Sequence, residues 1–229
     1  MTGRAGDTGA GSMESLYPFL YADTGDLAAV LEQVRASTVA KAGEITELRR
    51  VIAARDGARL AECARQAAAR FAKGGRLFAF GNGGSATDAQ QLATLFLHPG
   101  GDTRPLPAFG LANDTSVVTA LANDIGVDVV FARQLAAFGG KTDIAIGLST
   151  SGNSENLLRA FDEAARRGML TIGLAGYEGG KMAELDSIDY LFVAPSASIH
   201  RIQEAQTTIY QVFWELTLME VSHVPGHTG

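Results

Sequence analysis

Four short apolar runs in the later part of the chain constrain its fold more than any other sequence feature. They occupy residues 77–80, 144–148, 170–174 and 190–193, and residues 106–111 form a less regular fifth run. Each of the four is continuously apolar, which is typical of strands buried on both faces of a parallel sheet. Helical patterns fill the intervals, so the sequence predicts an α/β fold: a three-layer sandwich in which helices flank a five-stranded parallel sheet.

The helices are expected where apolar residues recur at helical spacing. After the first run they cover residues 86–97, 114–138 with a break near Gly126, 154–167 ending at Gly168, and 198–221. Before it, residues 26–55 predict one or two long amphipathic helices, and a further helix over residues 57–73 ends at Gly74-Gly75. The apolar faces of the N-terminal helices need a partner, which is either a second copy of the chain or a different protein.

Composition and charge exclude several classes of protein. The chain has 229 residues, of which 46% are apolar, so it can bury a sizeable core. Its single cysteine, Cys63, allows neither an intramolecular disulfide nor a thiolate metal cluster, which favours a cytoplasmic protein. A net charge of −6 opposes binding to nucleic acid or to an anionic membrane. We expect one domain over residues 24–222, between a disordered leader (1–23) and a disordered tail (223–229).

Two segments that follow expected strands carry the residue types of an anion site. Residues 80–88 read FGNGGSATD, and residues 148–155 read LSTSGNSE. In a parallel sheet, ligands bind beyond the carboxyl ends of the strands. A helix N-terminus with neighbouring hydroxyls binds an anion without needing a lysine, and glycines let the backbone approach the ligand. These two segments, called the first loop and the second loop below, are therefore the candidate ligand site.

Each loop also has a plainer interpretation. The hydroxyls of the second loop could serve only as helix caps, although one hydroxyl would suffice for that. The first loop fits a relaxed dinucleotide fingerprint, Gly81-x-Gly83-x-x-Ala86. The acidic residue that should follow about 20 positions later is Asp102, which stands in a Pro-Gly-Gly-Asp turn and not at a strand end. A nucleotide-binding oxidoreductase is therefore the remote alternative.

Five ordered segments resemble the sugar isomerase (SIS) domain family, in particular its phosphoheptose isomerase group. They read GNGGSATDAQ, LANDTSVVTALANDIGVDVVFARQL, LSTSGNSENLL, IGLAGYEGGKMAEL and RIQEAQTTIYQ, and the similarity extends over about residues 24–222. The resemblance implies a five-stranded parallel sheet, a phosphorylated sugar as ligand, and a homotetramer with ligand sites at subunit interfaces. The chain equally resembles a non-enzymatic relative, the DnaA initiator-associating protein.

The resemblance also implies which residues bind the ligand. The phosphate is expected on the hydroxyls of the second loop, and Asn82 and Ser85 of the first loop are expected to contact the sugar. The complete set of expected substrate-binding residues is Asn82, Gly83, Gly84, Ser85, Asp88, Asn113, Asp114, Ser149, Thr150, Ser151, Asn153, Ser154 and Gln203.

The acid–base and zinc positions of the isomerases carry other residues in this chain. On the helix after the first loop, the isomerases have a histidine and, four residues later, a zinc-binding glutamate that is the catalytic base. Here the histidine position is Gln91 and the glutamate position is Leu95. On the last helix Gln203 is kept, but the zinc-binding histidine eight residues later is Gln211. Amide and alkyl side chains transfer no proton near neutral pH, and amides are poor zinc ligands. We therefore expect no zinc and assign no catalytic residue.

Other titratable residues have weaker claims to a catalytic role. His200 begins the last helix and could donate or accept a hydrogen bond with a sugar, whereas Glu204 could replace the missing base only if the backbone were shifted. His98 precedes Pro-Gly and is more typical of a helix end. His223 and His227 lie in the expected tail.

These observations leave two main functional hypotheses. The first is a sugar-phosphate-binding SIS protein, for sedoheptulose 7-phosphate or a similar compound, in which isomerase chemistry is altered or lost. The second is a non-enzymatic tetrameric regulator or adaptor with an unidentified protein partner. Direct binding to nucleic acid or to a membrane is not expected.

Overall fold

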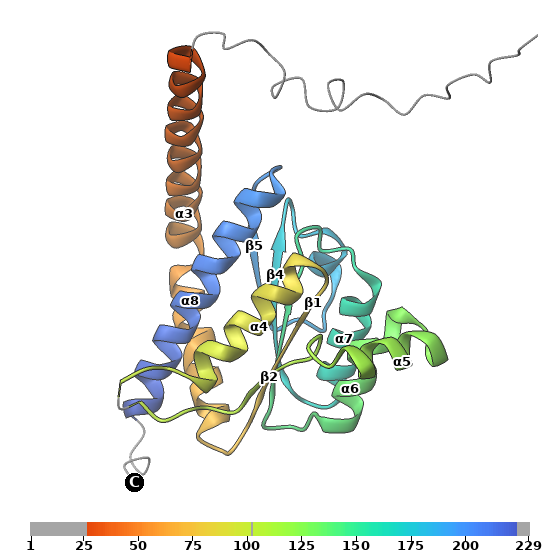
Figure 1. Ribbon diagram of the computed structural model, residues 1–229. Coiled ribbons are helices and arrows are strands. Elements are labelled where there is room, and N and C mark those ends of the chain that lie inside the picture. The colour runs from red at the N-terminus through yellow and green to blue at the C-terminus, as the bar shows by residue number, and fades with distance from the viewer. Residues whose placement is uncertain (1–26, 102, 224–229) are drawn as a thin grey trace, which may run out of the picture. The chain divides into compact units, whose positions relative to one another are not determined.

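The computed structural model describes residues 27–101 and 103–223 of the chain (Figure 1). It divides into two compact units, Met1–Gly43 and Glu44–Gly229. The expected disordered segments lie outside the described residues, apart from His223, which ends the last helix. Asp102 also lies outside them.

One long helix, α3 (Leu27–Phe71), stands where the sequence predicted two or three. Gly57 does not interrupt it, because this residue is exposed and has no neighbour within 4 Å of a Cβ position. A single exposed glycine costs about 1 kcal/mol in a helix, which the surrounding packing offsets. The part of α3 in the second unit buries Ile45, Leu48, Ile52 and Leu60.

The predicted five-stranded parallel sheet is confirmed. Its strands are β1 (Leu77–Gly81), β2 (Ala108–Gly110), β3 (Ile144–Leu148), β4 (Leu170–Gly176) and β5 (Tyr190–Ala194). They are arranged in the order β2-β1-β3-β4-β5, and all pairs are parallel. The β2 strand is shorter than the expected run 106–111, since Pro107 has no N–H to donate to the ladder.

The strands contribute to two separate cores, one on each face of the sheet. Leu77 and Ala79 belong to one apolar cluster, while Phe78 and Phe80 belong to the other. This alternation explains why the strands are continuously apolar, and it confirms the three-layer arrangement.

Helices cover both faces of the sheet (Figure 1). The first cluster is closed by residues 45–71 of α3 together with α4 (Gly84–Leu97) and α8 (Ile199–His223). The second is closed by α6 (Val130–Phe138) and α7 (Glu155–Arg166). The remaining elements are α5 (Thr115–Ile125), η1 (Val127–Val129) and η2 (Gly180–Glu184). Over the described residues, no helix has the length and hydropathy that crossing a bilayer requires.

Candidate functional site

The first and second loops meet where the strand order of the sheet changes direction. The chain passes from β1 outward to β2 and then returns to β3 on the other side of β1, so loops leaving β1 and β3 diverge. The last residues of these two strands, Gly81 and Leu148, are direct partners in the ladder. Such a switch point opens a crevice at the carboxyl edge of a parallel sheet. The sequence placed both loops at strand ends, and the strand order makes them neighbours.

Only glycine fits at the junction of the two loops. A Cβ on residue 81 would lie 2.7 Å from the Ser85 carbonyl oxygen and 2.9 Å from that of Leu148. The next residues turn sharply, because Gly83 has a φ of +55° and precedes the first residue of α4. The backbone of the first loop is therefore held closely against the end of β3.

A reciprocal amide pair joins the first loop to the helix that follows the second. The Nδ2 of Asn82 donates to Oδ1 of Asn156, and the Nδ2 of Asn156 donates to Oδ1 of Asn82, each over 2.9 Å. Asn156 is buried in the first turn of α7. Sequence reasoning missed it, since an amide in a first helical turn is usually exposed. Asn82, which is expected to contact the sugar, uses both polar atoms of its side chain to fix the loops together.

The second loop commits some of its polar groups to its own shape. The Oγ of Ser149 accepts from the Gly152 N–H (3.0 Å), and the Oγ of Ser151 accepts from the Asn153 N–H (3.2 Å). Asn153 Oδ1 accepts from the Lys181 N–H at 2.9 Å. A hydroxyl that accepts such a bond still has its own O–H to donate.

Other donors of the second loop have no acceptor within the described part of the chain. They include the hydroxyls of Thr150 and Ser154 and, at the start of α7, the N–H groups of Ser154, Glu155 and Asn156. The α7 N-terminus also carries the partial positive charge of the helix dipole. This turn therefore combines several uncommitted donors with the positive end of a helix dipole.

Two glutamines of α8 pack against the two loops. The Nε2 of Gln203 would lie 2.4 Å from a Cβ on residue 84, so its amide rests on the first loop. Gln206 is fully buried and donates from Nε2 to the Ser149 carbonyl oxygen at 2.9 Å. Its Oε1 has no hydrogen-bond partner among the described residues. Gln206 was not among the expected site residues, although its three-residue spacing from Gln203 places it on the same helix face.

Asp88 lies half-buried on α4, and its carboxyl group contacts the buried Tyr210 of α8. Burial raises the pKa of Asp88, and the hydrogen bond from Tyr210 opposes this effect in part. Burial is also the main cause that raises the pKa of Tyr210.

The remaining expected residues of the site lie beyond the end of β2. Asp114 caps α5, since its Oδ1 accepts from the Val117 N–H at 3.0 Å. Asn113 folds over the strand end, where its Nδ2 would lie 2.9 Å from a Cβ on Gly110. Asp114 therefore has a structural task of its own. Ser85 is buried in the first turn of α4, where the first loop enters the helix.

The positions that correspond to the acid–base pair carry no transferable proton. Leu95 packs against the first apolar cluster, while Gln91 and Gln211 are exposed. Within residues 27–101 and 103–223, no cluster of three or more His, Cys, Asp and Glu residues could hold a metal ion. One alkyl group and two amides do not fit Zn²⁺, which prefers imidazole, thiolate and carboxylate ligands.

The weaker catalytic candidates are not brought together. His200 is exposed in the first turn of α8, and His98 is exposed at the C-terminal cap of α4. Glu204 forms an ion pair with Arg201. His227 and the side chain of His223 lie outside the described part of the chain.

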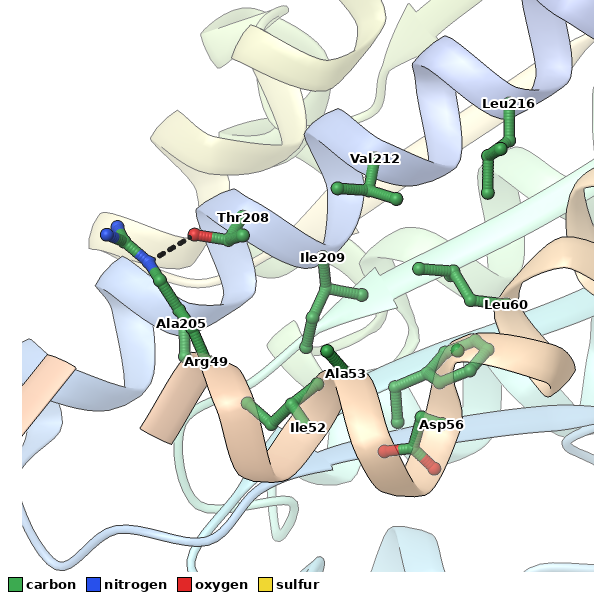
Figure 2. Close-up of a pocket in the computed structure, with 12 residues that line it drawn as sticks. Arg49, Ile52, Ala53, Asp56, Leu60, Ala205, Thr208, Ile209, Val212 and Leu216 are labelled. Atoms are coloured by element: carbon green, nitrogen blue, oxygen red, sulfur yellow. Dashed lines mark hydrogen bonds between the residues drawn. The ribbon is translucent and has the colours of Figure 1, made fainter. Parts of the chain in front are cut away.

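Several hollows open between the elements of the fold. A small apolar cavity of about 130 Å³ separates α3 from α8 in the second unit, where Ile52 and Leu60 face Ile209 (Figure 2). One rim is closed by the hydrogen bond from Arg49 Nε to Thr208 Oγ1, 2.8 Å long. A wider cleft of about 780 Å³ adjoins the second loop and is lined by Ser151, Asn153, Tyr177, Glu178, Gly180, Pro195, Ser196 and Ala197.

Sequence and structure comparisons identify the family. The SIS domain model matches residues 42–176, more than half of the chain. The phosphoheptose isomerase of Pelodictyon phaeoclathratiforme is 44% identical over 173 residues, which cover 74% of this chain and 82% of the relative. That of Desulfovibrio desulfuricans is 44% identical over 179 residues, covering 78% and 84%.

Solved structures agree with the sequence comparison. A phosphoheptose isomerase from Neisseria gonorrhoeae superposes with a TM-score of 0.74 at 32% identity, covering 80% of this chain and 98% of the other. One from Francisella tularensis gives a TM-score of 0.75 at 28% identity, covering 83% and 98%. The fold, the loops and these similarities together show that the chain belongs to the SIS domain family and is related to its phosphoheptose isomerases.

Proposed function

We propose that the chain binds a phosphorylated sugar, sedoheptulose 7-phosphate or a similar compound, with the phosphate at the N-terminus of α7. The observation that carries this proposal is the set of uncommitted donors in the second loop, which includes two hydroxyls and three backbone N–H groups. Such groups bind phosphate well because they need no reorganisation and add to the helix dipole. The names of the relatives, phosphoheptose isomerases, support the choice of ligand.

We further propose that the chain does not isomerise this sugar by the route of its relatives. Aldose–ketose isomerisation needs a base that removes a proton next to the carbonyl and an acid that protonates the enediolate oxygen. Leu95, Gln91 and Gln211 supply neither group. Their donor set also does not fit zinc, so no step is assigned to a metal.

A binding role without turnover favours a regulator or adaptor as the second candidate function. The observation behind it is that both loops are retained and firmly connected, while the acid–base positions are not. We place such a protein in the cytoplasm and expect it to assemble as a homotetramer. The exposed apolar residues at the start of α3, Leu27, Val30, Leu31 and Val34, support assembly because each is at least half exposed.

The test adds sedoheptulose 7-phosphate, with and without zinc, and follows both thermal stability and aldose formation. We expect stabilisation without turnover. Turnover would show that Leu95 and Gln211 do not prevent isomerisation. If no heptose or hexose phosphate stabilises the protein, the proposed phosphate site is contradicted.

Replacing the uncommitted hydroxyls tests the site more directly. The double substitution Thr150→Ala and Ser154→Ala should weaken phosphosugar binding about a hundredfold or more, since each of the two lost hydrogen bonds to a charged group contributes about 1.5–3 kcal/mol. It should leave the melting temperature of the free protein nearly unchanged. Ser149→Ala is the matched comparison. Unlike the double variant, it should lower the melting temperature of the free protein, because the Gly152 N–H loses its acceptor. Unchanged affinity in the double variant would contradict the proposed phosphate position.

A further inference from the structure

The turn after β4 places tyrosine where the backbone favours glycine. Tyr177 has a φ of +51° and is the one non-glycine residue with positive φ in the described part of the chain. The Gly179 N–H donates to the Gly176 carbonyl oxygen at 2.8 Å, which closes a four-residue turn with Tyr177 in its second position. Turns with positive φ at that position usually have glycine there, because a Cβ makes the conformation unfavourable. The turn contains glycine on both sides of Tyr177-Glu178, yet not at this position.

The fold does not offset this cost by packing the side chain. Tyr177 is 39% exposed and belongs to neither apolar cluster. Among the described residues its hydroxyl has no hydrogen-bond partner and its ring has no aromatic partner. By contrast, Tyr210 is buried and contacts Asp88. Residues that are held in an unfavourable backbone conformation without a gain in packing are found mainly at functional sites.

The turn holds Tyr177 at a fixed place beside the second loop. The Met182 N–H donates to the Gly152 carbonyl oxygen at 3.0 Å, and the Lys181 N–H donates to Asn153 Oδ1 at 2.9 Å. The two backbones are so close that a Cβ on Gly152 would lie 1.9 Å from the Gly179 carbonyl oxygen. Tyr177 is therefore positioned by the same contacts that shape the phosphate-binding turn.

The wide cleft is lined by both Tyr177 and the second loop. Ser151 and Asn153 of the second loop line it together with Tyr177, and its volume of about 780 Å³ is in the range of small-molecule sites. Over its described lining residues, Tyr177 is the one aromatic side chain. A tyrosine ring offers an apolar face to the C–H groups of a sugar and a hydroxyl to its O–H groups.

From these observations we infer that Tyr177 is a specificity-determining residue of the phosphosugar site and contacts the sugar portion of the ligand in the cleft beside the second loop. The inference rests on the proposed function, since it requires the phosphate to lie on the second loop. It adds a recognition element for the sugar, distinct from the donors that bind the phosphate.

Three variants separate this role from a structural one. Tyr177→Phe keeps the ring, Tyr177→Asn removes it but tolerates the left-handed conformation, and Tyr177→Gly removes both the ring and the unfavourable backbone conformation. Calorimetry measures binding of sedoheptulose 7-phosphate and of inorganic phosphate to each variant. We expect Tyr177→Asn and Tyr177→Gly to bind the phosphosugar about tenfold more weakly and inorganic phosphate unchanged. Tyr177→Phe should stay close to the parent, and Tyr177→Gly should melt no lower than the parent.

Each other outcome overturns the inference. If Tyr177→Asn binds the phosphosugar as tightly as the parent does, the Tyr177 ring does not contact the sugar. An equal loss of phosphosugar and phosphate binding would show that Tyr177 only shapes the turn. A parent chain that binds neither ligand would refute the phosphate site itself, and the role of Tyr177 with it.

Discussion

At the scale of single residues, Asp88 combines burial with a place on the helix that leaves the first loop. Its pKa lies above the ordinary value of 3.8 mainly because burial penalises the carboxylate. The folded protein therefore holds the proton more tightly than the unfolded chain does. Stability that is fully present at low pH is lost as the pH rises through the folded pKa of Asp88.

Asp88→Asn should remove this pH dependence. An amide cannot ionise, and its oxygen can still accept from the Tyr210 hydroxyl. The melting temperature of the variant minus that of the parent should increase as the pH rises from below 3.8 toward neutrality, and should then level off. Thermal denaturation at a series of pH values measures the difference. A difference that is the same at all pH values would contradict the assignment of the burial penalty to Asp88.

Some features of the candidate site could be predicted from single residues, and others could not. Residue type and position in the chain were enough to select both loops. They did not show that Asn82 is held by Asn156, or that Gln206 holds the Ser149 carbonyl oxygen. Both contacts join segments more than 50 residues apart, and no local pattern encodes such a pairing. Which hydroxyls remain free for a ligand likewise depends on these tertiary contacts.

At the scale of elements, the glycines of the site differ in what they allow. Gly152 and Gly83 both have positive φ, at +68° and +55°. A Cβ on Gly152 would lie 1.9 Å from the Gly179 carbonyl oxygen, whereas Gly83 has no neighbour within 4 Å of a Cβ position. Glycine is required at residue 152 by the close approach of two loops, and at residue 83 only by the local backbone conformation.

Alanine substitutions should separate the two requirements. Gly83→Ala should cost about 2 kcal/mol of stability, the cost of its positive-φ backbone conformation (φ +55°, ψ −125°) alone. Gly152→Ala should cost about 3 kcal/mol or more, because two backbones must also move apart. Urea denaturation measures both, and Gly83→Ala serves as the control. Equal losses in the two variants would mean that the two loops are not as closely packed as the structure has them.

Elements were easier to predict than their limits and order. Continuously apolar runs identified four strands and a less regular run the fifth, but the order β2-β1-β3-β4-β5, which makes the ends of β1 and β3 neighbours, comes from long-range pairing. A separate helix over residues 57–73 was predicted wrongly, since α3 continues through Gly57, where helix packing on both sides outweighs the local propensity. The extent of β2 was overestimated because the run contains Pro107.

At the scale of the whole molecule, the exposed start of α3 bears on the proposed homotetramer. Leu31 and Val34 stand two heptads before Ile45 and Leu48, which are buried in the second unit. The positions one heptad after Leu31 and Val34 are Thr38 and Lys41, so the apolar spacing is interrupted there and resumes at Ile45. Exposed apolar residues at the spacing of Leu27, Leu31 and Val34 are typical of a helix that packs against another helix.

The double substitution Leu31→Glu and Val34→Glu should lower the assembly state of the chain. Light scattering after size-exclusion chromatography should give about four times the 24.0 kDa chain mass for the parent and a smaller assembly for the variant. Val39→Glu is the matched control, because Val39 is equally exposed but lies off the helix face that carries Leu31 and Val34. A monomeric parent, or equal effects of the control and the double variant, would contradict this assembly.

The proposed function requires that the chain binds a phosphosugar without abstracting a proton from it. Proton NMR of sedoheptulose 7-phosphate in D₂O, in the presence of the protein and with or without zinc, tests both halves together. Proton abstraction from C1 of the ketose would give an enediolate, and its reprotonation would incorporate deuterium. We predict saturation transfer from the protein to the sugar protons and a C1 proton signal that keeps its intensity. Loss of the C1 signal, or the absence of saturation transfer, would contradict the account.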